Sequence, residues 1–383
     1  MNFELSEDQE ILRNTVREFC AKEVIPMARQ WDEEERFPSE IIPKLAELNL
    51  LGMMVSEEYG GAGMSLVDYV LVIEELARAD GSVCLTVASH NSLCTAHINL
   101  AGTPAQKKKY LPRLARGEIL GAWGLTEPGS GSDAAAARTT AVKRGDRWIL
   151  NGQKTFITQG SVGGVCVIMA STSPEKRQRG LTAFIVDKGT KGFRASRKIE
   201  KMGLHASDTA ELVLEDVEVG DEQRLGDVDA GFRDTLRILE RGRIGVASMA
   251  VGLGRGALEE ATKYSKERIQ FDVPLAKHQA IQFMLADMAT ELDAARLLTW
   301  RAAWLQDQGQ RTPLEASHAK LWAAQVAMRA CDKAIQIHGG YGYTREFPVE
   351  RYLRDAKLCE IGEGTNEVQR MLIARHLSAQ GLP

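Results

Sequence analysis

The chain has 383 residues, 44% of them hydrophobic, which is enough to bury a large core divided over two or three domains. Its 48 basic and 52 acidic residues are mixed along the sequence and leave a formal net charge of −4. This balance excludes the basic footprint of a nucleic-acid-binding protein. The six cysteines form no C-x-x-C pair and no zinc spacing with the seven histidines, so we expect reduced core thiols and no metal site.

The first residues are acidic where a signal or transit peptide would be basic. No uninterrupted apolar run reaches the roughly 18 residues of a membrane span. We therefore expect a cytoplasmic protein without a membrane span.

Helix signals dominate residues 1–118. Capping-box patterns predict helix starts at Ser6 with Gln9, at Ser65 with Asp68, and at 103–106. Apolar side chains then recur at helical spacing, as in the stripe formed by Leu12, Val16 and Phe19. The pattern predicts an N-terminal all-α domain whose helices each bury one face.

The pattern changes near residue 118. Short β-like runs separated by Gly, Asp and Asn occur at 148–150, 164–169, 182–186 and 210–214. They predict a small β domain over residues 119–228.

Helical periodicity returns from about Gly231 to Ser378, within a predicted C-terminal domain of residues 229–383. Its apolar residues include Leu297, Trp300 and Trp304, which are spaced for one buried face. The order of helices, β domain and helices predicts an α+β multidomain fold and argues against a doubly wound nucleotide-binding fold. The glycines at 252, 254 and 256 lack the dinucleotide-binding spacing and follow no strand, so they predict close helix packing.

The segment at 125–133, Leu-Thr-Glu-Pro-Gly-Ser-Gly-Ser-Asp, concentrates hydroxyls and exposed backbone N–H groups that can donate to a ligand. By composition alone, it is more typical of an ordinary turn. In this order, however, it resembles a signature of the acyl-CoA dehydrogenase family. Further segments at 151–158, 268–271, 336–342, 354–357 and 363–365 resemble that family in the same order, so the resemblance spans essentially the whole chain.

The resemblance implies N-terminal helices, a small β-barrel-like middle domain, a C-terminal four-helix bundle and an FAD cofactor. It implies FAD contacts from two groups of positions. The first group comes from the middle domain: Trp123, Leu125, Thr126, Ser132, Phe156, Ile157 and Thr158. The second comes from the C-terminal domain: Arg268, Gln270, Phe271, Gln279, Gln336, Ile337, His338, Gly339, Gly340, Thr365, Asn366 and Glu367. Phe156 departs from the tryptophan of many members but keeps an aromatic shield for the ring.

Glu363 matches the family's catalytic base. It lies between two glycines just before a helical pattern, where an acid is also favourable through the helix dipole alone. The dipole would lower its pKa, whereas burial beside an acyl chain would raise the pKa toward the operating pH. Some members place the base on an earlier helix; that position is Gly242 here, which cannot serve.

Ser132, Glu240, Arg243 and Gly364 match positions that contact the substrate. Glu240 and Arg243 could equally form a solvated ion pair on a helix. His278 and His338 fall in FAD-contact segments, but we assign neither a catalytic role.

The resemblance implies oxidation of an acyl-CoA to its trans-2-enoyl-CoA, in fatty-acid or branched-chain amino-acid breakdown, with electrons passed to electron-transfer flavoprotein. The alternatives are an acyl-CoA oxidase that uses oxygen, and a non-catalytic or nucleic-acid-associated relative. The segment Ala88 to Leu93 is similar to short-chain members and favours a short to medium acyl chain. The family's shared FAD contacts predict a homotetramer built as a dimer of dimers.

Overall fold

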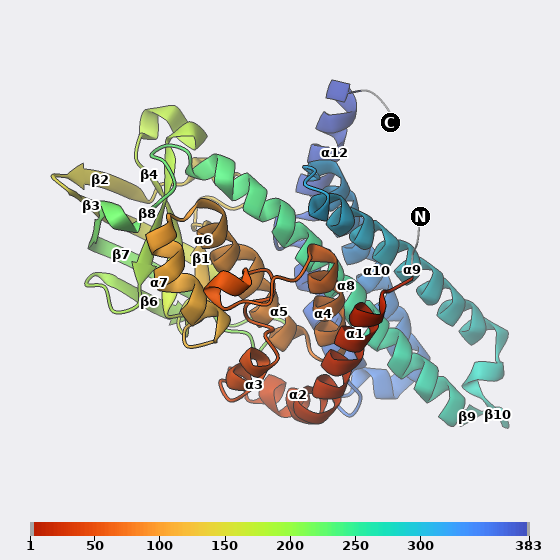
Figure 1. Cartoon of the computed structure of the whole chain (residues 1–383). Helices are drawn as coiled ribbons and strands as arrows, with labels where there is room; N and C mark the ends of the chain where they lie inside the picture. Colours follow the sequence, from red (N-terminus) through yellow and green to blue (C-terminus); the bar gives the residue numbers. More distant parts are fainter. Residues whose placement is uncertain (1–3, 381–383) are drawn as a thin grey trace.

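The computed structural model describes residues 4–380, which follow the order helices, sheet, helices (Figure 1). The N-terminal helices are α1 Glu7–Phe19, α2 Ile25–Glu33, α3 Ile41–Glu47, α4 Leu66–Ala79, α5 Gly81–Ser89, α6 Ala96–Ala101 and α7 Pro104–Ala115. The three predicted capping boxes are present, because the side chains of Ser6, Ser65 and Thr103 accept from the backbone N–H three residues later. A π-helical segment, His90–Thr95, joins α5 to α6.

The middle of the chain forms an eight-stranded sheet with the order β6-β7-β3-β2-β4-β5-β8, in which β1 pairs in parallel with β4. The strands are β1 Gly121–Gly124, β2 Thr140–Arg144, β3 Arg147–Thr158, β4 Val165–Ser171, β5 Leu181–Asp187, β6 Phe193–Lys198, β7 Thr209–Gly220 and β8 Arg224–Leu225. The four predicted runs are confirmed as parts of β3, β4, β5 and β7. The sequence missed the others because they are very short or, like β6, almost wholly exposed and therefore lack an apolar alternation.

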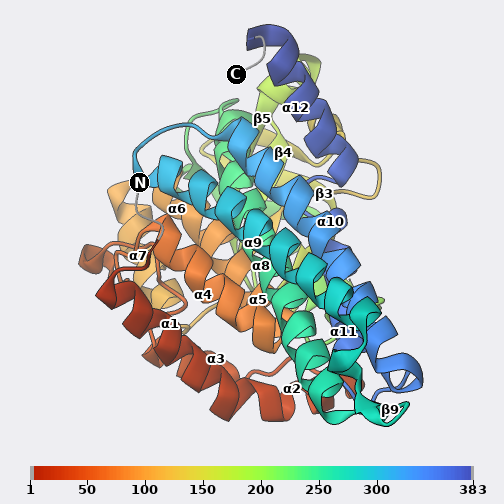
Figure 2. The ribbon, with the colours of Figure 1, turned by 90° about the vertical axis from the view of Figure 1, so that its right-hand side faces the viewer.

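The C-terminal part is built on a long helix, α8 Gly231–Glu267, which packs against α4 as well as α10 (Figure 2). It is followed by the hairpin β9 Ile269–Gln270 and β10 Val273–Pro274, then by α9 Gln279–Asp307, α10 Pro313–His338, α11 Val349–Ala356 and α12 Asn366–Gln380. Helices α8, α9 and α10 pack on one another, α11 packs on α8 and α10, and α12 packs on α10. The predicted fold class is confirmed.

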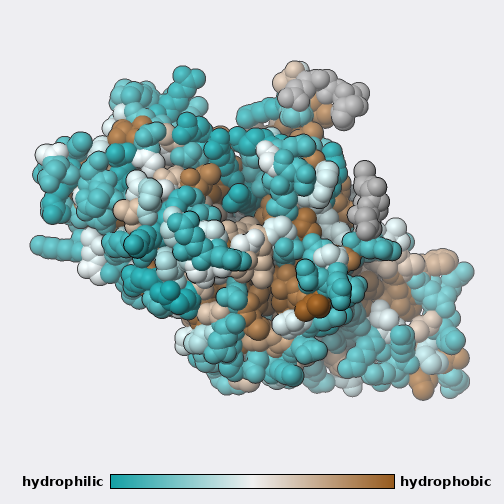
Figure 3. Space-filling view, in the orientation of Figure 1, coloured by the Kyte–Doolittle hydropathy of each residue, from teal (hydrophilic) through white to brown (hydrophobic). Residues whose placement is uncertain are grey.

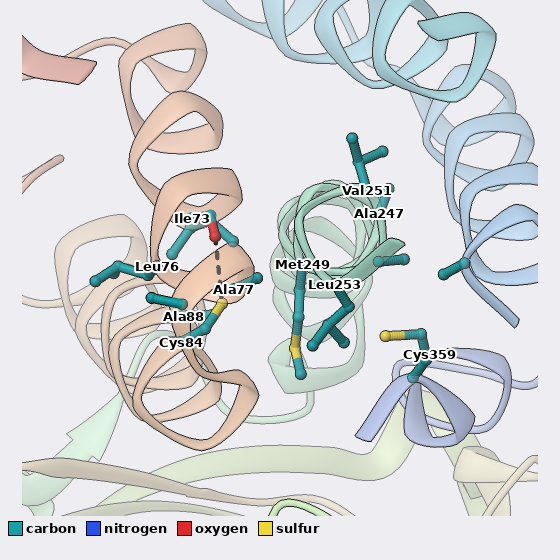
Figure 4. Packing of buried hydrophobic residues seen from close by; sticks show 14 of the residues in the cluster. Ile73, Leu76, Ala77, Cys84, Ala88, Ala247, Met249, Val251, Leu253 and Cys359 are labelled. Carbon is teal, nitrogen blue, oxygen red and sulfur yellow. Dashed lines mark hydrogen bonds between the residues drawn. The ribbon is translucent and has the colours of Figure 1, made fainter. Parts of the chain in front are cut away.

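The glycines of α8 allow the close packing that the sequence predicted. A Cβ at Gly252 would lie 2.3 Å from the carbonyl oxygen of Glu74, and one at Gly256 would lie 2.8 Å from that of Arg78. Both oxygens belong to α4. Figure 4 shows the core beside this contact, where Met249 and Leu253 of α8 lie between the α4–α5 pair and Cys359. All six cysteines are buried free thiols, as predicted.

The prediction that one face of α9 is buried in the core is wrong. Leu297 and Trp304 of α9 are 46% and 54% exposed, although their spacing predicted burial. The periodicity identifies an apolar face correctly, but nothing within residues 4–380 covers it. Figure 3 shows hydrophobic surface also at the end of the molecule that carries β9 and β10, where Phe271 is 90% exposed. Of the helices in residues 4–380, none combines the length and apolar character needed to cross a bilayer.

Candidate active site

Glu363 lies in a tight loop between the helical turn Lys357–Glu360 and α12. Its φ of 55° and the φ of 89° at Gly364 place two successive residues in the left-handed region, which turns the Glu363 side chain inward. Although part of the residue reaches the surface, its Oε2 atom is shielded from solvent and has no hydrogen-bond partner in the described part of the chain. Burial raises the pKa of this carboxyl to about 7, against the opposing charges of Arg243 and Lys320.

Gly242 of α8 faces this carboxyl directly. A Cβ built at Gly242 would lie 2.5 Å from Oε2 of Glu363 and 2.9 Å from its Cδ. The two positions at which the family resemblance allows a base therefore converge on one point, and the glycine leaves room for the carboxylate. One turn further along, a Cβ at Gly245 would lie 2.6 Å from the hydroxyl of Tyr69, so α4 closes the same region.

Glu240 and Arg243 lie beside this point, and both are buried. They do not form the solvated ion pair that the sequence left open. The Arg243 Nε donates to the backbone oxygen of Glu363 at 3.5 Å, while Glu240 accepts two hydrogen bonds from Arg311. Arg311, in the turn between α9 and α10, was missed because no local pattern links it to α8.

The segment at 125–133 continues directly from β1. The Thr155 N–H donates to the Thr126 oxygen at 2.9 Å, which joins this segment to β3. A buried ion pair reinforces the junction, because Lys154 lies 2.7 Å from Glu127 and also donates to the Leu125 oxygen at 3.2 Å. Sequence reasoning gave Glu127 and Lys154 no role, although each is a charge inside a motif that it had singled out.

Three family models match the chain in order: the acyl-CoA dehydrogenase N-terminal domain over residues 6–118, the middle domain over 122–217 and the C-terminal domain over 229–378. The chain belongs to the acyl-CoA dehydrogenase family. The short-chain-specific acyl-CoA dehydrogenase of Clostridium acetobutylicum is 46% identical to it, over 98% of this chain and 99% of the relative.

Solved structures agree with this assignment. A chain from a structure described as the electron transferring flavoprotein of Acidaminococcus fermentans is 45% identical, with a TM-score of 0.97 and coverage of 98% of this chain and 99% of that one. A glutaryl-CoA dehydrogenase of Mycobacterium smegmatis, solved in complex with FADH2, is 33% identical, with a TM-score of 0.93 and coverage of 99% and 96%.

The expected FAD positions in the middle domain of this acyl-CoA dehydrogenase are partly buried and partly open to solvent. Trp123 is buried, and its Nε1 donates to Nδ1 of His97 at 3.0 Å, which fixes the indole. Phe156 is 66% exposed at a φ of 57°, so its ring faces open space next to the buried Ile157. Ser132 is exposed and Thr158 is partly exposed. A Cβ at Gly129 or Gly131 would meet nothing within 4 Å, so the backbone of the loop is open to a ligand.

Nine expected FAD positions of the C-terminal domain, from Arg268 to Gly340, lie far from the middle-domain positions within one chain. The middle domain meets the N-terminal end of α8, whereas Arg268 follows its C-terminal end, after 37 helical residues that span about 55 Å (Figure 1). The guanidinium of Arg268 lies 5.8 Å from the centroid of the Tyr341 ring. Nearby, the rings of His338 and Tyr264 stack with their centroids 4.3 Å apart. The exposed positions at this end are Gln270, Phe271, Gln279, Gln336, Gly339 and Gly340, whereas Ile337 is buried.

The remaining expected positions of the dehydrogenase lie on the Glu363 loop and the start of α12. Thr365 accepts from the Val368 N–H at 3.3 Å, and Glu367 is exposed. Asn366 points inward instead: it is 4% exposed and accepts from Lys320 at 3.2 Å. The loop that carries Glu363 is thus attached to α10.

Proposed function

We propose that the protein catalyses FAD-dependent α,β-dehydrogenation of acyl-CoA thioesters, with Glu363 as the base. The observation that carries this proposal is the shielded, unpartnered Oε2 of Glu363, which lies against a glycine. A base that removes the weakly acidic α-proton of a thioester works best with a pKa near the operating pH. The raised pKa of about 7 meets that requirement.

Different residues of the chain have different roles in the proposed reaction. Glu363 takes the α-proton, and its backbone N–H would donate to the thioester carbonyl as negative charge develops there. Arg243 holds the peptide of Glu363 through the backbone oxygen and keeps a positive charge nearby. A bound FAD would accept the hydride that leaves the β-carbon. The Trp123, Phe156 and Thr158 side chains would form the middle-domain side of the ring site.

The test is anaerobic mixing of the purified, FAD-loaded protein with butyryl-CoA, followed through bleaching of the flavin absorbance. We expect Glu363→Gln to retain FAD and to lose bleaching, because the amide keeps the shape of the side chain but not its basicity. Glu218→Gln, at an exposed ion pair on β7, is the matched control and should react like the wild type. Normal bleaching by Glu363→Gln would refute the assignment of the base.

The proposed FAD site is completed by a second chain. The middle-domain FAD positions and Arg268 of one chain are separated by the length of α8, so they cannot contact the same FAD molecule. Arg268 offers paired donors suited to a pyrophosphate. The uncovered apolar face of α9 is a suitable surface for subunit contact. We infer a homotetramer arranged as a dimer of dimers, in which one chain supplies the ring site and another supplies the Arg268 end.

We further infer a short to medium acyl chain and electron-transfer flavoprotein as acceptor, in fatty-acid or branched-chain amino-acid breakdown. The chain-length inference is supported by the short-chain-specific relative, and that of the acceptor by the flavoprotein structure that contains a similar chain. A panel of straight and branched acyl-CoAs, ranked by bleaching rate, tests the first inference; an optimum at long chains would contradict it. Stoichiometric oxygen consumption during turnover would indicate an oxidase instead.

A further inference from the structure

Lys320 of α10 is a lysine with no exposed surface. A buried ammonium loses the solvation of water and normally needs a carboxylate beside it. Lys154, the other wholly buried lysine of the described chain, has such a partner in Glu127 at 2.7 Å. Among the ion pairs of residues 4–380, none involves Lys320. Its burial therefore calls for another explanation.

The side-chain hydrogen bond of Lys320 leads to the base. Its Nζ donates to Oδ1 of Asn366, the first residue of α12, at 3.2 Å. The amide nitrogen of Asn366 in turn lies 3.4 Å from Oε1 of Glu360, at the other end of the loop. Lys320 thereby links α10 to the segments on both sides of the loop 361–365.

That loop needs such support because its backbone is strained. The left-handed conformation of Glu363 costs an L-residue about 1–2 kcal/mol. The buried Gln369 holds the loop from the α12 side, since its amide donates to the backbone oxygens of Glu363 at 3.2 Å and Gly364 at 2.8 Å. Lys320 holds it from the α10 side.

Lys320 also acts on Glu363 through charge. Burial raises the pKa of Glu363, and the positive charges of Arg243 and Lys320 oppose that rise. Burial lowers the pKa of Lys320 to about 8, opposed by the charges of Cys359, Glu363 and Glu360 and assisted by that of Arg243. The phenol of Tyr69 also faces Glu363 from α4, and burial keeps it neutral by raising its pKa.

We propose that Lys320 is a positioning residue for this dehydrogenase: it fixes the strained loop through Asn366 and keeps a positive charge near Glu363, which favours the ionised form of the base. Arg243 is the second cation at this point, but it contacts the backbone oxygen of Glu363 rather than the start of α12. The proposal rests on the proposed role of Glu363. It assigns to α10 a part in proton removal that is separate from substrate and cofactor contact.

The experiment compares Lys320→Met, which removes both the charge and the donor, with Asn366→Ala, which removes the acceptor but leaves the ammonium. Anaerobic bleaching by butyryl-CoA is measured from pH 5.5 to 9. We expect the acid-side midpoint of the bleaching rate to rise by roughly one pH unit in Lys320→Met, because a nearby opposite charge favours the carboxylate. Asn366→Ala should slow bleaching without moving the midpoint. Lys320→Gln, a smaller change to the core, should also raise the midpoint of the bleaching rate. This variant replaces Lys320→Met in the experiment if the methionine variant does not fold.

The ionisation of Glu363 can be read independently of activity from its infrared carboxyl band, identified by its loss in Glu363→Gln. This band should titrate at higher pH in the Lys320 variants than in the wild type. An unchanged midpoint and an unchanged carboxyl titration in the Lys320 variants would overturn the proposal while leaving Glu363 as the base. Normal bleaching by Glu363→Gln would instead refute the base itself, so the two failures are distinguishable.

Discussion

Substituting Gly242 by alanine tests the geometry of the active site with one added methyl group. The new Cβ would lie 2.5 Å from Oε2 of Glu363, whereas real Cβ contacts essentially never fall below 3.0 Å. The carboxylate must therefore move by at least half an ångström, or α8 must shift. Because a misplacement of about 1 Å at a reacting group can cost about 100-fold in rate, we expect flavin bleaching to slow by roughly 10-fold or more.

The effect on stability should be small by comparison. Alanine in place of glycine inside a helix gains about 1 kcal/mol, while overpacking costs about 1–3 kcal/mol. The matched control is Gly254→Ala on the same helix, where the added Cβ would lie 2.7 Å from the Cδ2 of Leu292 and away from Glu363. Stopped-flow bleaching and urea unfolding are measured on both variants. Wild-type bleaching by Gly242→Ala, or equal slowing in the two variants, would refute the proposed contact.

Four further substitutions test the effects of burial and assembly. Because burial raises the pKa of Glu363 from 4.5 to about 7, ionising this carboxyl destabilises the fold as the pH rises through that window. Glu363→Gln should therefore match the stability of the wild type below pH 4.5 and be up to about 3 kcal/mol more stable above pH 7. A difference in thermal unfolding that does not depend on pH would contradict this expectation. Glu127→Ala leaves the Lys154 ammonium buried and unpaired, so urea unfolding should show a loss of about 3–5 kcal/mol, and a loss under about 1 kcal/mol would argue against the pair. Arg268→Ala should retain its secondary structure by circular dichroism but lose FAD on dialysis. Trp304→Glu should dissociate the assembly, as measured by sedimentation. A monomer that carries full flavin would exclude the shared site.

The sequence by itself determined the features that depend on neighbours along the chain. The capping boxes at Ser6, Ser65 and Thr103 were predictable because each is a hydrogen-bonding pattern within four residues. The strongly apolar strands were predictable for the same reason, since a short apolar run bounded by Gly, Asp or Asn is a local signal. The ordered motifs indicated the family, and with it the identity of Glu363 as the candidate base.

The tertiary structure alone decided the environment of that base. The dipole and burial arguments gave opposite directions for the pKa of Glu363, and burial prevails because α8 and α4 enclose the carboxyl from distant parts of the sequence. The partner of Glu240 proved to be Arg311, and the contact of Lys320 proved to be Asn366. Spacing along the chain cannot predict such pairs, because they depend on how separate helices pack. For the same reason, the apolar spacing on α9 identified an apolar face, but it could not show that the other described residues leave this face exposed.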